Sequence, residues 1–229
     1  MAIDVKVRVR LERALGATTP ELGPRAADDA RRLWGRVGRF LAMGLIPRPA
    51  DAAPLELACY ALQLPNRPGA AAAGSGKPAP ANRMGQASLR DRSEQAAELL
   101  VNVLNGEAPE DLVARATALL REIPLRRPAA DEAKLLADAV NLDDFGMTGL
   151  FLQAIQQART GGGLSHVVEG WEKRTQYGYW DVRLKDSFHF DAVRRLARER
   201  LESAAAGAAM LLRELTEDRP DNGSGGGAP

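Results

Sequence analysis

Cysteine is almost absent from this chain, which has one, Cys59, among its 229 residues. A single thiol excludes an intrachain disulfide, and its absence is typical of proteins from a reducing compartment. Cys59 lies in the apolar run Leu-Ala-Cys-Tyr-Ala, where a cysteine usually acts as a small core residue rather than a nucleophile. The sequence also lacks the spacings of a zinc site and of a Cys/His or Ser/His/Asp catalytic set.

An excess of charge of one sign is missing as well. The chain has 31 basic and 30 acidic residues and a net charge of +1. Without a positive field, neither nucleic acid nor an anionic membrane surface is a predicted partner. No apolar run approaches the ~18 residues of a membrane-spanning helix. Charges interrupt the N-terminal stretch, which therefore lacks the apolar core of a signal peptide. We therefore predict a soluble, cytoplasmic protein with no membrane partner.

Aromatic residues make up only 5% of the chain, although 45% of it is apolar. Alanine and leucine dominate the apolar set, and both favour helices over strands. The sequence therefore predicts an all-α fold, a single helical domain over residues 1–217. The Gly- and Ala-rich residues 65–87 are predicted to be a flexible loop, and residues 218–229 a disordered tail. Apolar spacing predicts helices over 30–43, 53–64, 92–105, 109–123, 131–143, 147–159 and 188–217.

Residues 3–11 are the one exception to this helical pattern. Apolar Ile3, Val5, Val7, Val9 and Leu11 alternate there with charged residues. A period of two predicts a half-buried strand. No second strand is evident, so a strand from another copy, or a helix instead, stays open as an alternative. The aromatic residues 160–186 are predicted to form an irregular connection.

The stretch at 135–146 is the most specific in the chain and reads Leu-Leu-Ala-Asp-Ala-Val-Asn-Leu-Asp-Asp-Phe-Gly. It resembles the late helix of the HD-domain phosphohydrolase superfamily, where a D-A-D-x-L-D-x-x-G run is common. The order of the predicted helices is similar too, and so is the later run Leu-Ala-Arg-Glu-Arg at 196–200. The resemblance covers residues 28–217. It implies an HD-like helical bundle descended from a metal-dependent phosphohydrolase.

The same resemblance implies that the metal ligands have been lost. HD enzymes hold a divalent metal with imidazoles and carboxylates, whereas residues 1–165 contain no histidine. Apolar or amide side chains stand instead near the family's ligand positions, and Val140 replaces the second aspartate of the run, whereas Asp138 and Asp143 match its first and later aspartates. These vestigial pocket candidates are Leu33, Trp34, Leu62, Gln63, Asp138 and Val140. Neither a metal nor another cofactor is predicted.

Three carboxylates, Asp138, Asp143 and Asp144, gather at the end of the predicted helix. Acidic groups there oppose the helix dipole, so a compensating arginine is expected. A rebuilt Mg²⁺ site made of these oxygens is the alternative. The two histidines, His166 and His189, are predicted to be surface or packing residues, with a general acid or base as the alternative. The aromatics at 171–190 predict a satellite core, or else an exposed patch or dimer contact.

These features favour a catalytically inactive HD-like domain with a binding, regulatory or scaffolding role, and so not an enzyme. An active phosphohydrolase of nucleotides or phosphoesters with a rebuilt metal site is one alternative. A structural, self-associating helical protein is the other, so a homo-oligomer stays open. The sequence does not identify a ligand.

Overall fold

A computed structural model describes residues 3–16, 25–47, 51–64, 89–159 and 161–217 of the chain. Within these ranges the regular elements are all helices and no strand occurs, so the all-α prediction is confirmed. The predicted loop at 65–87 and the predicted tail at 218–229 lie outside the described residues. None of the described helices is long and apolar enough to cross a membrane.

The chain divides into two compact units, which we call unit 1 (Met1–Val140) and unit 2 (Asn141–Pro229). The single domain predicted over 1–217 stays a prediction. The helices of unit 1 are α1 (Val5–Gly16), α2 (Arg25–Ala42), α3 (Ala53–Ala61), α5 (Leu89–Leu104), α6 (Glu110–Glu122) and α7 (Asp131–Asn141), whose last residue begins unit 2. Unit 2 contains the short 3-10 helix η2 (Leu142–Asp144), then α8 (Gly146–Arg159), α9 (Leu164–Gln176), α10 (Tyr179–Asp186) and α11 (Asp191–Glu217).

Helix α1 corrects the strand predicted for residues 3–11. Ile3, Val7, Leu11 and Leu15 are buried at intervals of four residues. The alternate residues Val5 and Val9 are exposed. An interval of four keeps side chains on one helical face. The apparent period of two arose because two further valines stand on the solvent side of the same helix.

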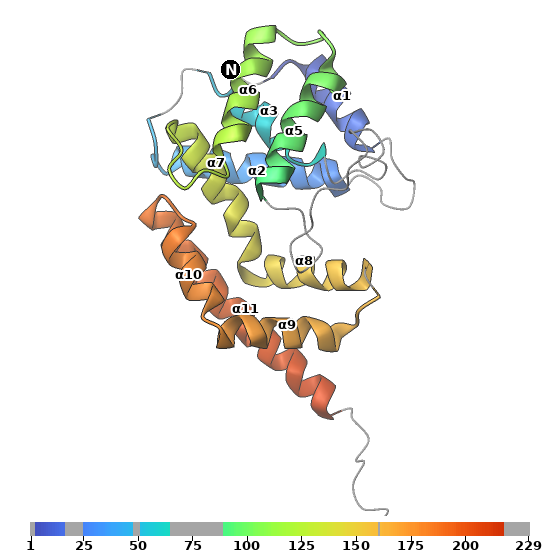
Figure 1. The fold of residues 1–229 in the computed structure, drawn as a ribbon, viewed down its shortest axis with the longest axis vertical. Coiled ribbons are helices and arrows are strands. Elements are labelled where there is room, and N and C mark those ends of the chain that lie inside the picture. Colours follow the sequence, from blue (N-terminus) through green and yellow to red (C-terminus); the bar gives the residue numbers. More distant parts are fainter. Residues whose placement is uncertain (1–2, 17–24, 48–50, 65–88, 160, 218–229) are drawn as a thin grey trace, which may run out of the picture. The chain divides into compact units, whose positions relative to one another are not determined.

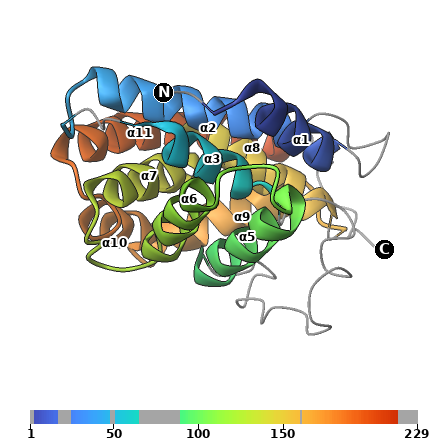
Figure 2. The same ribbon diagram turned by 90° about the horizontal axis from the view of Figure 1, so that it is seen from above.

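Helix α3 is the centre of unit 1, and all of its residues are buried. It packs against α1, α2, α5 and α6, and Figures 1 and 2 show it enclosed among them. Pro54 lies in its first turn, where no intrahelical amide bond is lost. Because neighbours surround α3, any polar side chain on it must find its partner inside the protein.

Unit 2 is built around the crossing of α8 and α9 by the long helix α11 (Figure 1). At Gly207 of α11, an added Cβ would lie 2.6 Å from the sulfur of Met147 on α8. The small residue therefore leaves room for the end of the Met147 side chain, which would have to shift if a larger residue stood at this crossing.

The region at 160–186 is not the irregular connection that the sequence predicts, because α9 and α10 occupy most of it. Val167, Val168 and Trp171 provide the buried helical face of α9. The ring of Trp180 lies 4.8 Å from that of Trp171 and 5.5 Å from that of Phe145. The predicted satellite core is confirmed for these buried rings, whereas Tyr177 is exposed.

Candidate functional site

The six vestigial pocket candidates all lie in unit 1, on three elements. Leu33 and Trp34 are on α2, Leu62 and Gln63 follow α3 directly, and Asp138 and Val140 are near the end of α7. Trp34 is half-buried and the other five are buried. Helices α2 and α3 pack together, so four of these positions lie on neighbouring elements of one core.

Arg36 connects α2 to the end of α7. Its guanidinium is almost fully buried and donates a hydrogen bond of 2.5 Å to the carbonyl of Ala139. Asp138, the preceding residue, has no solvent exposure. A cation near the C-terminus of a helix is favourable, because it offsets the partial negative charge of the free carbonyls. Sequence analysis missed Arg36, although its spacing from Leu33 and Phe40 places it on the buried face of α2.

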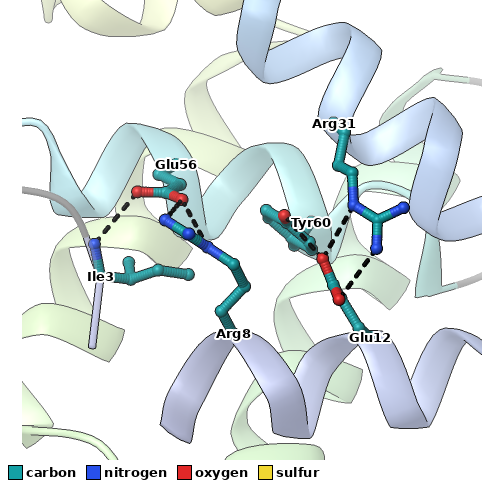
Figure 3. A network of polar contacts seen from close by, with 6 residues as sticks. All are labelled: Ile3, Arg8, Glu12, Arg31, Glu56 and Tyr60. Atoms are coloured by element: carbon teal, nitrogen blue, oxygen red, sulfur yellow. Dashed lines mark hydrogen bonds and ion pairs between the residues drawn. The ribbon is translucent and has the colours of Figure 1, made fainter. Parts of the chain in front are cut away.

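A second buried ionic group involves Glu56 on α3, which has no exposed surface. One oxygen of Glu56 accepts a hydrogen bond of 3.0 Å from the backbone amide of Ile3. The other accepts two bonds from Arg8, 3.1 Å from Nε and 2.5 Å from Nη2 (Figure 3). Two bonds to one guanidinium strengthen the pair and fix its geometry. Glu56 therefore connects α1 to the centre of unit 1.

A neighbouring set extends this network to α2 (Figure 3). Glu12 accepts hydrogen bonds from Arg31 Nε at 3.0 Å and from the Tyr60 hydroxyl at 3.2 Å. The hydrogen bond from Arg31 holds the pKa of Glu12 below its usual value. Burial raises the pKa of Tyr60, with the nearby Glu12 charge acting in the same direction. Both shifts favour a charged Glu12 and a neutral Tyr60 in the folded state.

The position of Glu56 could have been predicted. It is the one charged residue in the apolar run Ala53–Leu64, on a helix too apolar to present a solvated face. A lone charge in such a run indicates a buried ion with a partner elsewhere. Its partner, Arg8, is separated from it by 48 residues and was not predictable.

Cys59 is fully buried, so the predicted core role is confirmed. Burial, followed by the negative charge of Glu56, raises the pKa of its thiol. The positive charge of Arg36 acts in the opposite direction. A thiol held neutral in this way is a poor nucleophile, because the thiolate is the reactive form.

One of the carboxylates that follow α7, Asp144, has the compensating arginine that the sequence predicts. Arg183 on α10 forms an ion pair with Asp144 and donates to the side-chain oxygen of Asn141 at 3.3 Å. Asn141 in turn donates to the carbonyl of Ser187 at 2.8 Å. The Asp144 carboxylate therefore has a structural role within unit 2.

The two histidines lie on different elements, His166 in the first turn of α9 and His189 just before α11. His166 is exposed, and its Nδ1 accepts a hydrogen bond of 3.2 Å from the amide of Gly163 at the start of α9. This bond satisfies an amide at the helix end and so gives His166 a capping role. His189 is half-buried. Over the described ranges, no three His, Cys, Asp or Glu side chains come together as a metal-binding group.

Two surface hollows lie on unit 2. One, of about 440 Å³, lies between α10 and α11 and is lined by Asp181, Leu184, Lys185, Arg194 and Arg198. The donors of Arg194 are already used, by the carbonyls of Leu184 and Phe188 and by Asp191. The other, of about 530 Å³, is an elongated and mainly apolar groove between α9 and α11.

Comparison of the chain with protein-family models, with curated proteins and with solved structures finds no match.

Proposed function

We propose that this protein is a catalytically inactive, HD-like helical domain that acts by binding or scaffolding. One observation carries the proposal. The apolar residues at the positions matched to the family's metal ligands, Leu33, Leu62 and Val140, are buried side chains of the core. The HD ancestry itself rests on the resemblance of residues 135–146.

These positions do not fit the divalent metal that the resemblance implies. A divalent cation needs imidazole nitrogens or carboxylate oxygens, which leucine and valine cannot supply. Buried side chains in a close-packed core also leave no space for the water that such a metal would activate. In this proposal Arg36 provides the fixed positive charge near Asp138 that a metal would otherwise provide.

The first experiment measures metal content and turnover of the purified full-length protein. We expect substoichiometric Mn, Mg and Fe by elemental analysis after exchange into metal-free buffer. We also expect no hydrolysis of bis-p-nitrophenyl phosphate or of a nucleotide panel with added Mn²⁺. Near-stoichiometric metal, together with turnover that a chelator abolishes, would contradict the proposal. That outcome would support a phosphohydrolase with a rebuilt site.

A matched pair of variants sharpens this test. Asp138→Asn removes a buried carboxylate of the stretch that resembles the HD helix, and Asp131→Asn removes an exposed one at the start of the same helix. Any measured turnover that Asp138→Asn abolishes and Asp131→Asn preserves would assign it to the unit 1 site. Circular dichroism at 222 nm would check that both variants remain folded.

The second experiment tests the binding role by thermal melting against nucleotides and other small phosphate compounds. A ligand at about 100 times its Kd stabilises the native state by about 2.7 kcal/mol, which shifts the melting midpoint by several degrees. A concentration-dependent shift would support a ligand-binding role. If none of the compounds shifts the melting midpoint, the proposal is limited to scaffolding through protein contacts.

A further inference from the structure

The groove between α9 and α11 has an apolar floor and no described segment over it. Its lining is formed by Val168, Trp171, Glu172, Thr175 and Gln176 of α9 and by Ala205, Ala208, Ala209 and Leu212 of α11. The α9 side includes the Trp171 ring together with two branched and two long polar side chains, and the α11 side consists of three alanines and a leucine. Small residues on one wall allow another helix to approach closely.

The exposed face of α11 beside this groove has the spacing of a helix–helix contact. Positions 198, 202, 205, 209, 212 and 216 recur at alternating intervals of four and three, which places them in one stripe. Ala205, Ala209 and Leu212 form the apolar centre of the stripe, and all three are exposed. The centre of the stripe therefore has the chemistry of an interface.

Charge is distributed unevenly along the same helix. Residues 191–204 of α11 contain four arginines and three carboxylates, whereas residues 205–217 contain one arginine and two glutamates. The N-terminal half therefore has a net charge of +1 (4 − 3) and the C-terminal half a net charge of −1 (1 − 2). Two such helices attract each other when they lie antiparallel and repel each other when they lie parallel.

Four charged side chains near this stripe have no ion-pair partner within the part of the chain that the structure describes: Arg198, Glu202, Arg213 and Glu217. When one α11 is placed antiparallel to another, a single register brings Glu202 opposite Arg213 of the partner subunit. The same register brings Arg198 opposite Glu217 of the partner subunit. Two-fold symmetry then repeats both pairs.

We propose that a second copy of this chain occupies the groove, with its α11 antiparallel to the first. The apolar centre of each stripe packs into the α9–α11 groove of the other copy, and the two kinds of ion pair flank it. Such an interface uses the same surface on both copies, so the assembly closes at two subunits. This inference does not depend on the proposed loss of catalysis, and the metal and turnover measurements are independent of it.

The apolar part of the interface is tested by sedimentation equilibrium of the full chain at micromolar concentrations. The unaltered protein is expected to have the mass of a dimer. Ala209→Glu places a charge at the centre of the groove and is expected to raise the dimer Kd by at least about tenfold. Val182→Glu, an equally drastic change at an exposed apolar residue of α10 outside the groove, is the control and should leave the Kd unchanged.

The register is tested by reversing charges. Arg213→Glu and Glu202→Arg are each expected to weaken the dimer by about tenfold, because each places like charges opposite one another. The double variant Glu202→Arg/Arg213→Glu restores both pairs in the antiparallel register and should recover the original Kd. Arg90→Glu, a charge reversal at an exposed residue of α5 in unit 1, is the matched control.

Three results would overturn the inference. The first is a monomer at all accessible concentrations. The second is a dimer that Ala209→Glu leaves intact, which would place the contact elsewhere. The third is a double variant as weak as its single parents, which would exclude the antiparallel register. The substituted residues are exposed, and unchanged circular dichroism would show that the variants remain helical.

Discussion

The two units of the chain bury their large side chains to very different extents. Among the described residues, all of the twelve largest fully buried side chains except Phe145 belong to unit 1. Fourteen large apolar side chains are exposed in the same part of the chain, and nine of them belong to the shorter unit 2, Phe151 and Met210 among them. Unit 1 has a core of its own, whereas unit 2 leaves much of its apolar surface uncovered.

The polar groups differ in the same way. Unit 1 contains Arg36, Glu56 and Asp138 inside its core, where desolvation is costly unless a partner is present. The ion pair of unit 2 between Arg183 and Asp144 includes a carboxylate that is mostly exposed. Unit 1 therefore derives more of its stability from buried internal contacts, and the uncovered apolar surface of unit 2 includes the face that the proposed dimer would bury.

The largest expected effect separates the two cores. Leu57→Ala removes a fully buried side chain of α3 and should lower the free energy of unfolding by about 2–5 kcal/mol, because a cavity remains. Phe151→Ala on α8, where the ring is 62% exposed, should lower it by less than about 1 kcal/mol. Urea denaturation followed by circular dichroism measures both. Equal losses would show that unit 2 also depends on a tight core.

The next effect tests the buried carboxylate of unit 1. Arg8→Met leaves the Glu56 carboxylate in the core with the Ile3 amide as its remaining hydrogen-bond donor among the described residues, and should cost about 2–3 kcal/mol. Adding Glu56→Gln removes the unpaired charge and should recover part of the loss. The same urea titration yields the coupling free energy from a double-mutant cycle. Additive effects would mean that the pair contributes no coupling.

A smaller difference is expected between two arginines near the end of α7. Arg36→Met removes a buried donor to Ala139 and should destabilise the protein by about 1–3 kcal/mol. Arg183→Met breaks the pair with the exposed Asp144 and should cost less than about 1 kcal/mol. Thermal melting compares the two variants directly. A larger loss of stability in Arg183→Met than in Arg36→Met would contradict this expectation.

The smallest effect is a dependence on pH. The pKa of Glu12 is lower in the folded state than in the unfolded state. The charged Glu12 therefore contributes to the free energy of unfolding above the unfolded pKa, and this contribution is lost as the pH falls through the folded pKa. Below about pH 4.5, Glu12→Gln should therefore lose less stability than the unaltered protein does. The difference should be less than about 1 kcal/mol, because the partner Arg31 is half-exposed. Urea titrations at pH 3 to 7 measure this change. Glu94→Gln, at an exposed ion pair, is the control.

Tyr60 makes stability change with pH in the opposite direction, with a loss in alkaline solution. Its folded-state pKa is raised, so stability is fully present below the unfolded pKa near 10 and is lost as the pH rises through the folded value. Tyr60→Phe should remove this alkaline loss in the same titration extended to pH 11. A loss that persists in Tyr60→Phe would assign it to another group.

Much of this fold could be predicted from local sequence. The buried residues of α5, α6 and α11 follow the helical spacing of apolar residues in the sequence. This spacing identifies the buried face of an amphipathic helix without knowledge of its neighbours. Helix α1 was mistaken for a strand because its valines satisfy a period of two and a period of four together. The choice between them came from Leu15, one turn beyond the predicted strand, which continues the interval of four.

The candidate site was less predictable for a different reason. Residues such as Leu33 and Leu62 are apolar, and an apolar side chain predicts burial without knowledge of its neighbours. The roles of Arg8, Arg36 and Glu56 depend on partners 48 to 103 residues away. A charged residue has a strong preference for water, so its local sequence predicts exposure unless the partner is known.

The sequence by itself determined an all-helical chain, the helical faces and the apolar identity of Leu33, Leu62 and Val140, because these follow from side-chain chemistry and a local period. Only the tertiary structure decided which charges lie inside unit 1 and which apolar groups stay uncovered on unit 2. Burial is a property of what surrounds a residue, and those surroundings are supplied by helices distant in the chain.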